Sequence, residues 1–178
     1  MVSRVIPVDD FDLVIFGGTG DLARRKILPG LYRRYLAEQM PEGARIIGAA
    51  RSDQDSAAWR ASVRDAIIEF VDDSKKHPEK IEAFLQCLEY VPVDATGEGG
   101  WHDLADLMRE DVTQAFYFSV APSLFGALAE RLKSHDIARE GARIVVEKPF
   151  GRDLETAKAL NATLAAHFDE TQIYRIDH

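Results

Sequence analysis

Short apolar runs of strand-forming residues recur along the chain, and most are followed by a longer stretch with helical spacing. This alternation is typical of repeated βα units, which build a parallel sheet. The runs 14–16, 116–118 and 144–146 are apolar without alternation, as strands covered on both faces by helices should be. The pattern predicts six strands, at residues 11–16, 45–50, 88–93, 115–120, 143–147 and 172–176.

Helical spacing is clearest in three of the connections between these strands. Pro122 suits a first helical turn, and behind it an apolar stripe comprises Phe125, Leu128, Ala129 and Leu132. Asp153 can cap another helix, whose apolar face comprises Ala157, Leu160, Leu164, Ala165 and Phe168. The first connection is predicted to be a helix over residues 20–38 that Pro29 kinks or splits.

Six parallel strands in this alternation predict an α/β fold, a doubly wound sheet with helices on both faces. Right-handed crossovers then give the strand order 3-2-1-4-5-6. Residues 95–100 form a turn-rich loop and no domain linker, so we expect residues 1–178 to make one domain. Ligands of such sheets bind beyond the carboxyl ends of the strands, where we look for the chemistry.

Composition narrows the class of protein. The chain has 178 residues, of which 46% are hydrophobic and 29% charged, which is typical of a globular protein and excludes disordered and fibrous classes. The net charge of -8 disfavours nucleic acid as a partner. Cys87 is the single cysteine, so no internal disulfide forms, and no His/Cys cluster offers a metal site. Without a long apolar run or a signal peptide, we expect no membrane partner and a cytoplasmic location.

A glycine-rich turn follows the first predicted strand. Gly18, Gly20 and Ala23 match the pattern G-x-G-x-x-G/A, between a strand and a helix as that pattern requires. Glycines allow a tight turn and a close approach of the backbone to a pyrophosphate, and the helix N-terminus favours an anion. The turn indicates a Rossmann dinucleotide-binding domain; the alternative is a glycine turn with a structural role alone.

Two basic features suggest which dinucleotide binds and how. Arg51 directly follows the second strand, where it suits the 2′-phosphate of NADP and is not needed by the 2′-hydroxyl of NAD. A solvated surface arginine is the alternative. Residues 24–34 carry five basic residues and no acidic one. Among these, Lys26 lies close enough to the glycine turn to reach the cleft, whereas Arg33 and Arg34 fit a solvated helix face equally well.

The last two strands also end in candidate residues. Lys148 follows the fifth strand, and Pro149 restricts it to an extended conformation, which suits a ligand contact. Asp177 and His178 end the sixth strand, and their side chains diverge if the strand continues. Asp177 then suits the orientation of a base from elsewhere and His178 the binding of an anion, with a polar strand terminus as the alternative.

Four of these segments together resemble one enzyme family. Residues 17–26 (GGTGDLARRK), Arg51, residues 147–151 (EKPFG) and residues 175–178 (RIDH) are similar to glucose-6-phosphate dehydrogenase, in the same order and across the whole chain. The resemblance implies oxidation of glucose 6-phosphate at C1 to 6-phosphogluconolactone, with hydride transfer to NADP, in the pentose phosphate pathway.

The resemblance also implies residue roles. The dinucleotide is assigned to Gly17, Gly18, Thr19, Gly20, Asp21, Leu22, Arg51, Asp94 and Lys148, with Thr19 and Arg51 near the 2′-phosphate and Asp94 on the adenosine side. Lys26 and Lys148 would face the sugar or the nicotinamide, and His178 would bind the sugar phosphate. Asp177 would hold the catalytic histidine that takes the C1 hydroxyl proton.

In that family the histidine belongs to a larger C-terminal substrate and dimerisation domain, after the RIDH motif. We therefore expect this chain to be the coenzyme domain alone, able to bind NADP without turnover, and the full-length protein to be a homo-oligomer. Two alternatives are a free-standing NADP-sensing module and a dehydrogenase of another sugar substrate. The EKPFG and RIDH segments argue against both.

Overall fold

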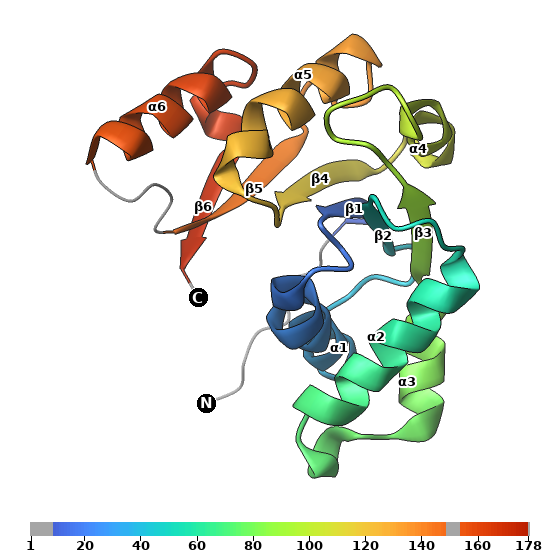
Figure 1. Cartoon of the computed structure of the whole chain (residues 1–178). Helices are drawn as coiled ribbons and strands as arrows, with labels where there is room; N and C mark the ends of the chain where they lie inside the picture. Colours follow the sequence, from blue (N-terminus) through green and yellow to red (C-terminus); the bar gives the residue numbers. More distant parts are fainter. Residues whose placement is uncertain (1–8, 149–153, 178) are drawn as a thin grey trace.

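A computed structural model describes residues 9–148 and 154–177 of the chain. Its centre is a six-stranded sheet with the order β3-β2-β1-β4-β5-β6 and helices on both faces (Figure 1). Neighbouring strands run parallel throughout. The doubly wound α/β architecture and its strand order, both predicted from the alternation of strands and helices, are confirmed.

The strands are Phe11–Phe16 (β1), Arg45–Ala50 (β2), Leu88–Pro92 (β3), Thr113–Phe118 (β4), Arg143–Lys148 (β5) and Ile173–Asp177 (β6). The α-helices are Leu28–Leu36 (α1), Ser56–Phe70 (α2), Pro78–Leu85 (α3), Trp101–Leu107 (α4), Phe125–Ser134 (α5) and Leu154–Ala165 (α6). Short 3-10 turns span Asp73–Lys75, Pro122–Leu124 and Glu170–Gln172, and a π-helical turn spans Ala23–Ile27. Within the described ranges, the helices are too short or too polar to cross a membrane.

Two helical layers bury the sheet, because successive residues of a strand point to opposite faces. From β1, Leu13 and Ile15 join the core under α1, α2 and α3, whereas Val14 and Phe16 join the core under α4, α5 and α6. Figure 1 shows the first layer next to β1, β2 and β3, and α5 and α6 over β4, β5 and β6. The central strands are therefore covered on both sides, as their unbroken apolar runs predicted.

The predicted strand boundaries agree with the structure to within two residues, and β1 and β2 match. β4 begins earlier than expected, at Thr113, and ends at Phe118, because the chain turns at Ser119, whose amide donates to the Tyr117 carbonyl two residues back (3.2 Å). β6 begins one residue late because Gln172 is still part of a capping box. β3 ends at residue 92 and β5 extends to residue 148.

The helix predicted behind Pro122 is confirmed. Pro122 opens a 3-10 turn, α5 follows directly, and the four residues of the expected stripe are buried. For α6 the prediction is right for Leu164 and Phe168, which are buried, and wrong for Ala165, which is exposed. Ala165 ends the helix about 100° round from Leu164, outside the narrow stripe that faces the sheet. Asp153, the expected cap, lies outside the described residues.

The first connection is helical, as predicted, but it is not split at Pro29; the helix continues through that residue, and its irregular turn comes before the proline. A π-helical turn over Ala23–Ile27 leads directly into α1, whose first turn contains Pro29. Proline has no N–H to donate, and its ring crowds the carbonyl of the fourth residue before it, here Arg25. The wider π turn relieves this conflict within the preceding turn.

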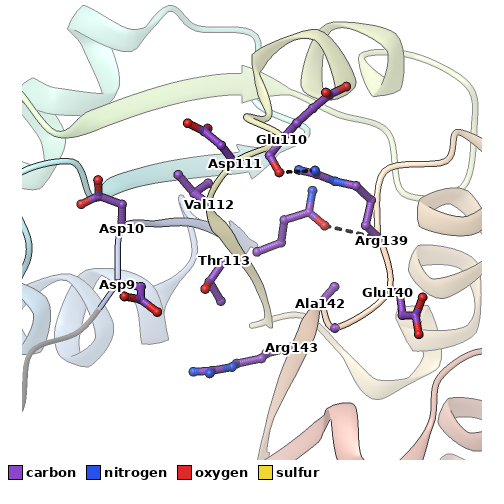
Figure 2. Close-up of a pocket in the computed structure, with 12 residues that line it drawn as sticks. Asp9, Asp10, Glu110, Asp111, Val112, Thr113, Arg139, Glu140, Ala142 and Arg143 are labelled. Atoms are coloured by element: carbon purple, nitrogen blue, oxygen red, sulfur yellow. Dashed lines mark hydrogen bonds between the residues drawn. The ribbon is translucent and has the colours of Figure 1, made fainter.

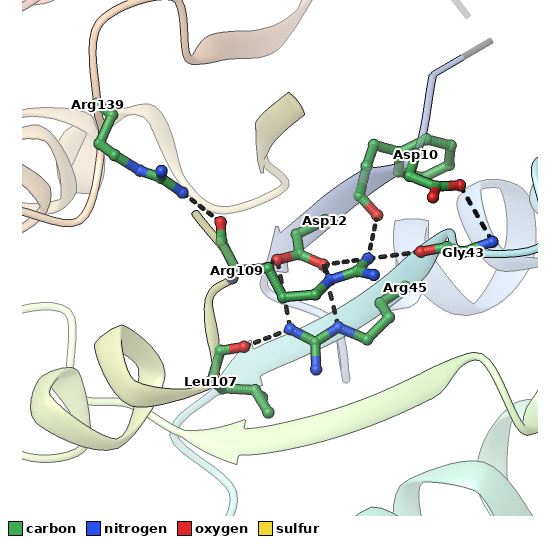
Figure 3. A network of polar contacts seen from close by, with 8 residues as sticks. Asp10, Asp12, Gly43, Arg45, Leu107, Arg109 and Arg139 are labelled. Atoms are coloured by element: carbon green, nitrogen blue, oxygen red, sulfur yellow. Dashed lines mark hydrogen bonds and ion pairs between the residues drawn. The ribbon is translucent and has the colours of Figure 1, made fainter. Parts of the chain in front are cut away.

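A buried carboxylate holds together the amino-terminal edge of the sheet (Figure 3). Asp12 on β1 is fully buried, and its Oδ1 accepts hydrogen bonds from the Nε atoms of Arg45 and Arg109, both at 3.0 Å. The Arg109 amide donates to the Asp12 Oδ2 (2.8 Å), and its guanidinium also donates to the Gly43 carbonyl. One side chain thus links β1, the start of β2 and the segment before β4.

We expect this network to make folding stability depend on pH. Burial raises the pKa of Asp12, but the hydrogen bonds from Arg45 and Arg109 outweigh it and hold the pKa below its ordinary value of 3.8. The stabilisation is therefore present above about pH 4 and lost as the pH falls through the lower pKa of the folded state. Asp12→Asn should cost about 3 kcal/mol of unfolding free energy at pH 7 and much less near pH 2.5. Urea unfolding of both proteins at the two pH values measures this, and an equal cost at both would contradict it.

Candidate dinucleotide site

The turn after β1 is built around Gly17–Gly20. Gly17 has a φ of +83°, which favours glycine, and a Cβ there would collide with the carbonyl of Ser119. The Gly17 amide donates to the Ala49 carbonyl (2.8 Å), and the Gly20 amide donates to the Gly17 carbonyl (2.9 Å). The turn is therefore fixed against the ends of both β2 and β4.

Gly18 approaches the backbone of β2 closely. A Cβ at Gly18 would lie 3.0 Å from the Gly48 Cα and 3.4 Å from the ring of Trp59. The fully buried Trp59 on α2 donates from its Nε1 to the Gly18 carbonyl (3.0 Å). Gly48 and Trp59 thus set the position of the turn, and our sequence reasoning missed both. The contact joins residues 41 positions apart, which no local pattern reveals.

A helix begins at Asp21, directly behind the turn. The Arg24 amide donates to the Gly20 carbonyl (3.1 Å), and the fully buried Ala23 packs in the core under α1, as the small third position of the fingerprint requires. The first amides of a helix lack partners within it and lie at the positive end of its dipole. This end of the helix can therefore bind a phosphate group.

A cavity of about 250 Å³ opens beside this turn, at the carboxyl edge of the sheet. Its lining comes from the ends of β1 and β2 and from the segments after β3 and β4, and comprises Phe16, Gly17, Thr19, Gly20, Ala49, Ala50, Arg51, Ser52, Val93, Ala95, Val120, Leu124 and Leu128. Apolar walls with a glycine turn on one side and a cation on another suit one half of a dinucleotide. Of the predicted cofactor residues, Gly17, Thr19, Gly20 and Arg51 line it.

Arg51 lies where the sequence predicted, directly after β2. It is exposed, and it lines both this cavity and a neighbouring groove of about 420 Å³. The Tyr90 hydroxyl donates to the carbonyls on either side of Arg51, those of Ala50 (3.1 Å) and Ser52 (2.8 Å). The backbone that carries Arg51 is therefore held in place by Tyr90, another residue that our sequence reasoning did not single out.

Asp94 lines the groove together with Arg51. Its carboxylate accepts hydrogen bonds from the amide and the hydroxyl of Thr96, both at 3.1 Å. These bonds, with a smaller contribution from the charge of Arg51, lower the pKa of Asp94. Asp94 is therefore ionised at neutral pH. It lies in the same groove as Arg51, the residue predicted to bind the 2′-phosphate.

The basic run of residues 24–34 has a mainly structural explanation. The guanidinium groups of Arg24 and Arg25 lie over the ring of Phe70, 5.1 Å and 5.3 Å from its centre, and Arg24 pairs with Glu69. Arg25 also donates to Asp21 (2.7 Å). Lys26 is exposed and is not among the residues that line the cavity or the groove. The carboxylate of Asp21 and the side chain of Leu22 are likewise outside both linings.

The ends of β5 and β6 lie side by side at the same edge of the sheet. In the parallel register, Lys148 pairs with Asp177, so two predicted site residues become neighbours although 29 positions separate them along the chain. Residues 149–151 of the EKPFG segment and His178 lie outside the described residues. The roles predicted for Lys26, Lys148, Asp177 and His178 stay predictions.

A larger cavity of about 650 Å³ lies at the opposite, amino-terminal edge of the sheet (Figure 2). It is lined by five carboxylates, Asp9, Asp10, Glu110, Asp111 and Glu140, and by the basic residues Arg139 and Arg143. The Arg139 guanidinium donates to the backbone carbonyls of Arg109 and Glu110. The excess of carboxylates repels phosphate groups, so this cavity does not compete as the dinucleotide site.

A glycine turn at the switch point between β1 and β4, with a helix N-terminus and a cavity beside it, defines a dinucleotide-binding domain of the doubly wound class. The family model for "Glucose-6-phosphate dehydrogenase, NAD binding domain" matches residues 14–178. The chain therefore belongs to the glucose-6-phosphate dehydrogenase family, as its NAD-binding domain.

Individual relatives agree with this assignment. The chain is 46% identical to glucose-6-phosphate 1-dehydrogenase of Rhizobium meliloti (strain 1021), covering 100% of this chain and 37% of the relative, and 43% identical to that of Gluconobacter oxydans (strain 621H), covering 96% and 36%. A crystal structure of the Mycobacterium avium enzyme superimposes with a TM-score of 0.85 at 38% identity, covering 94% and 36%. The chain thus spans little more than a third of the length of these relatives.

Proposed function

We propose that the chain is the coenzyme-binding domain of an NADP-dependent glucose-6-phosphate dehydrogenase. The observation that carries this proposal is the cavity between the glycine turn and Arg51. A Cβ at Gly17 or Gly18 would crowd the backbone that forms it. Arg51 is an exposed cation directly after β2, which supports a contact with the 2′-phosphate of NADP. The residues present therefore fit the adenosine half of NADP.

The proposed reaction is oxidation of glucose 6-phosphate at C1 to 6-phosphogluconolactone, and the nicotinamide ring supplies the hydride acceptor. A relative of 29% identity and TM-score 0.85 has a structure described as a complex with its substrate glucose 6-phosphate, which supports this choice of substrate. On this proposal Lys26 and Lys148 face the sugar or the nicotinamide, and His178 binds the sugar phosphate. Asp177 orients the base that takes the C1 hydroxyl proton.

The proposal also covers the rest of the protein. A C-terminal domain outside this chain would supply the histidine base and the remaining substrate contacts, and the full-length protein would be a homo-oligomer. The limited share of the relatives that this chain covers supports a further domain. A cytoplasmic location belongs to the same proposal, and the presence of only one cysteine supports it.

Arg51→Ala tests the choice of dinucleotide. We expect NADP to bind the wild-type chain more tightly than NAD, and the variant to lose about 10- to 150-fold in NADP affinity, since a hydrogen bond to a charged group contributes roughly 1.5–3 kcal/mol. NAD affinity should barely change. Calorimetry with both dinucleotides measures the ratio, with Arg34→Ala as the control for loss of a helix-surface cation. An unchanged ratio in Arg51→Ala would remove Arg51 from the site.

A further inference from the structure

Tyr117 on β4 contacts the end of β5. Its side chain is buried, with 7% of the residue exposed, and its hydroxyl donates to the Glu147 Oε1 at 2.6 Å. This is a short hydrogen bond to a group that carries negative charge, a class that is about twice as strong as a bond between neutral groups. Glu147 immediately precedes Lys148, so the bond acts on the strand end that carries this lysine.

The bond lies beyond the backbone ladder between these two strands. The register of β4 with β5 runs from Ala115 opposite Arg143 to Tyr117 opposite Val145, and the last residues of β5 then pair with β6 as far as Lys148 opposite Asp177. β6 is an edge strand of the sheet. The Tyr117 side chain therefore continues the connection from the centre of the sheet to the end of β5 after the backbone ladder has stopped.

Tyr117 can act only as a donor in this contact at neutral pH. Burial, and then the hydrogen bond to the Glu147 carboxylate, raise the pKa of Tyr117 above its ordinary value. Its ring belongs to the core under α1, which fixes its position, and Ile15 of β1 lies opposite it in the ladder. The hydroxyl is thus anchored to the strand that also leads into the glycine turn.

We propose that Tyr117 is a positioning residue for Lys148. Through Glu147 its hydroxyl fixes the end of β5, the strand whose last residue is Lys148. The proposed function assigns Lys148 to the nicotinamide half of the dinucleotide. This inference rests on the proposed function, because it needs Lys148 to contact the cofactor. If so, β4 supports both halves of the site: the chain after β4 lines the cavity for the adenosine half, and Tyr117 fixes the strand end that carries Lys148.

Two ligands separate positioning from general stability. NADP spans both halves of the site, whereas adenosine 2′,5′-bisphosphate represents the adenosine half alone. In calorimetry on the purified chain, Tyr117→Phe should weaken NADP binding about tenfold, because misplacing Lys148 loses its charged hydrogen bond to the cofactor, a class of bond worth at least roughly 1.5 kcal/mol. Binding of the fragment should stay within about twofold. Lys148→Ala should change the ratio in the same way, and the double variant should add little to either single variant.

The controls make each outcome decisive. Tyr174→Phe removes a hydroxyl from the neighbouring strand β6, and both affinities should stay at the wild-type level. If Tyr117→Phe does not melt cooperatively, Glu147→Ala removes the acceptor instead and should produce the same selective loss. The inference would be overturned if these variants lost affinity equally for NADP and for the fragment, or if they lost affinity for neither. If Lys148→Ala also leaves NADP affinity unchanged, the role proposed for Lys148 is itself wrong; if Lys148→Ala alone weakens NADP, only the role of Tyr117 fails.

Discussion

Mixed with glucose 6-phosphate and NADP, the purified chain is expected to produce no NADPH above background. Transfer of a hydride from C1 needs a base within hydrogen-bond reach of the C1 hydroxyl and a sugar held against the nicotinamide. General-base catalysis contributes about 100- to 10,000-fold, and positioning about 7–11 kcal/mol of barrier reduction. Without the general base, and with only part of the positioning, the chain should show no measurable rate of hydride transfer.

The proposal assigns the base to a domain outside this chain, and the described histidines have other contacts. His102 pairs with Asp106 on α4, and His135 bonds to Glu98 at 2.8 Å. His167 contacts the Thr163 carbonyl, and His77 precedes α3. None of these four lines the cavity or the groove at the carboxyl edge. His178, outside the described residues, is assigned to the sugar phosphate by the proposal.

The assay follows NADPH absorbance over time, with calorimetry on the same sample to verify that NADP is bound. Cofactor binding without turnover is the expected combination, because the glycine turn and Arg51 are both present in the chain. Robust turnover would mean that the base lies within these 178 residues.

Gly20→Val should abolish binding of both dinucleotides while the chain still unfolds cooperatively. Gly20 lines the cavity, and the nearest atom to a Cβ built there is the Gly17 carbonyl oxygen at 3.1 Å, so the turn can accept a side chain with a small shift. The valine methyl groups would then occupy the space where a pyrophosphate meets the backbone. Loss of two charge-assisted bonds, at roughly 1.5–3 kcal/mol each, weakens binding by more than about 100-fold.

Thermal melts with and without NADP measure this effect. The wild-type chain should melt at a higher temperature with NADP, and the variant should show no shift. Gly30→Val is the matched control, because a Cβ at Gly30, in α1, meets no atom within 4 Å and the site is unchanged. A shift of wild-type size in Gly20→Val would mean that the turn has a structural role alone.

Local patterns predicted the fold well because the central strands carry unbroken apolar runs and turn residues separate the strands from the helices. Right-handed crossovers between the strands then gave the order 3-2-1-4-5-6. The glycine turn and Arg51 were predictable for a similar reason: both follow a strand end directly, so position along the chain fixes position at the edge of the sheet.

Contacts between distant segments were not predictable in this way. Asp12 interrupts an apolar strand, and only the folded chain shows that Arg45 and Arg109 surround it. Tyr90 and Trp59 read as ordinary core residues, yet each hydrogen-bonds to the backbone of the binding site. The packing of Arg24 and Arg25 on Phe70 was not predictable either, because cation–π contacts leave no periodic signal.

The indole rings of Trp59 and Trp101 connect two loops at the carboxyl edge of the sheet, the glycine turn and residues 94–97, to opposite helical layers. Trp59 donates to the Gly18 carbonyl from the α2 side, and Trp101 donates to the carbonyls of Asp94 (2.8 Å) and Gly97 (3.0 Å) from the α4 side. Opening either loop would break a hydrogen bond from a fully buried indole and leave its N–H without that acceptor. These hydrogen bonds should therefore restrict both loops before any nucleotide binds, which lowers the conformational entropy cost of binding.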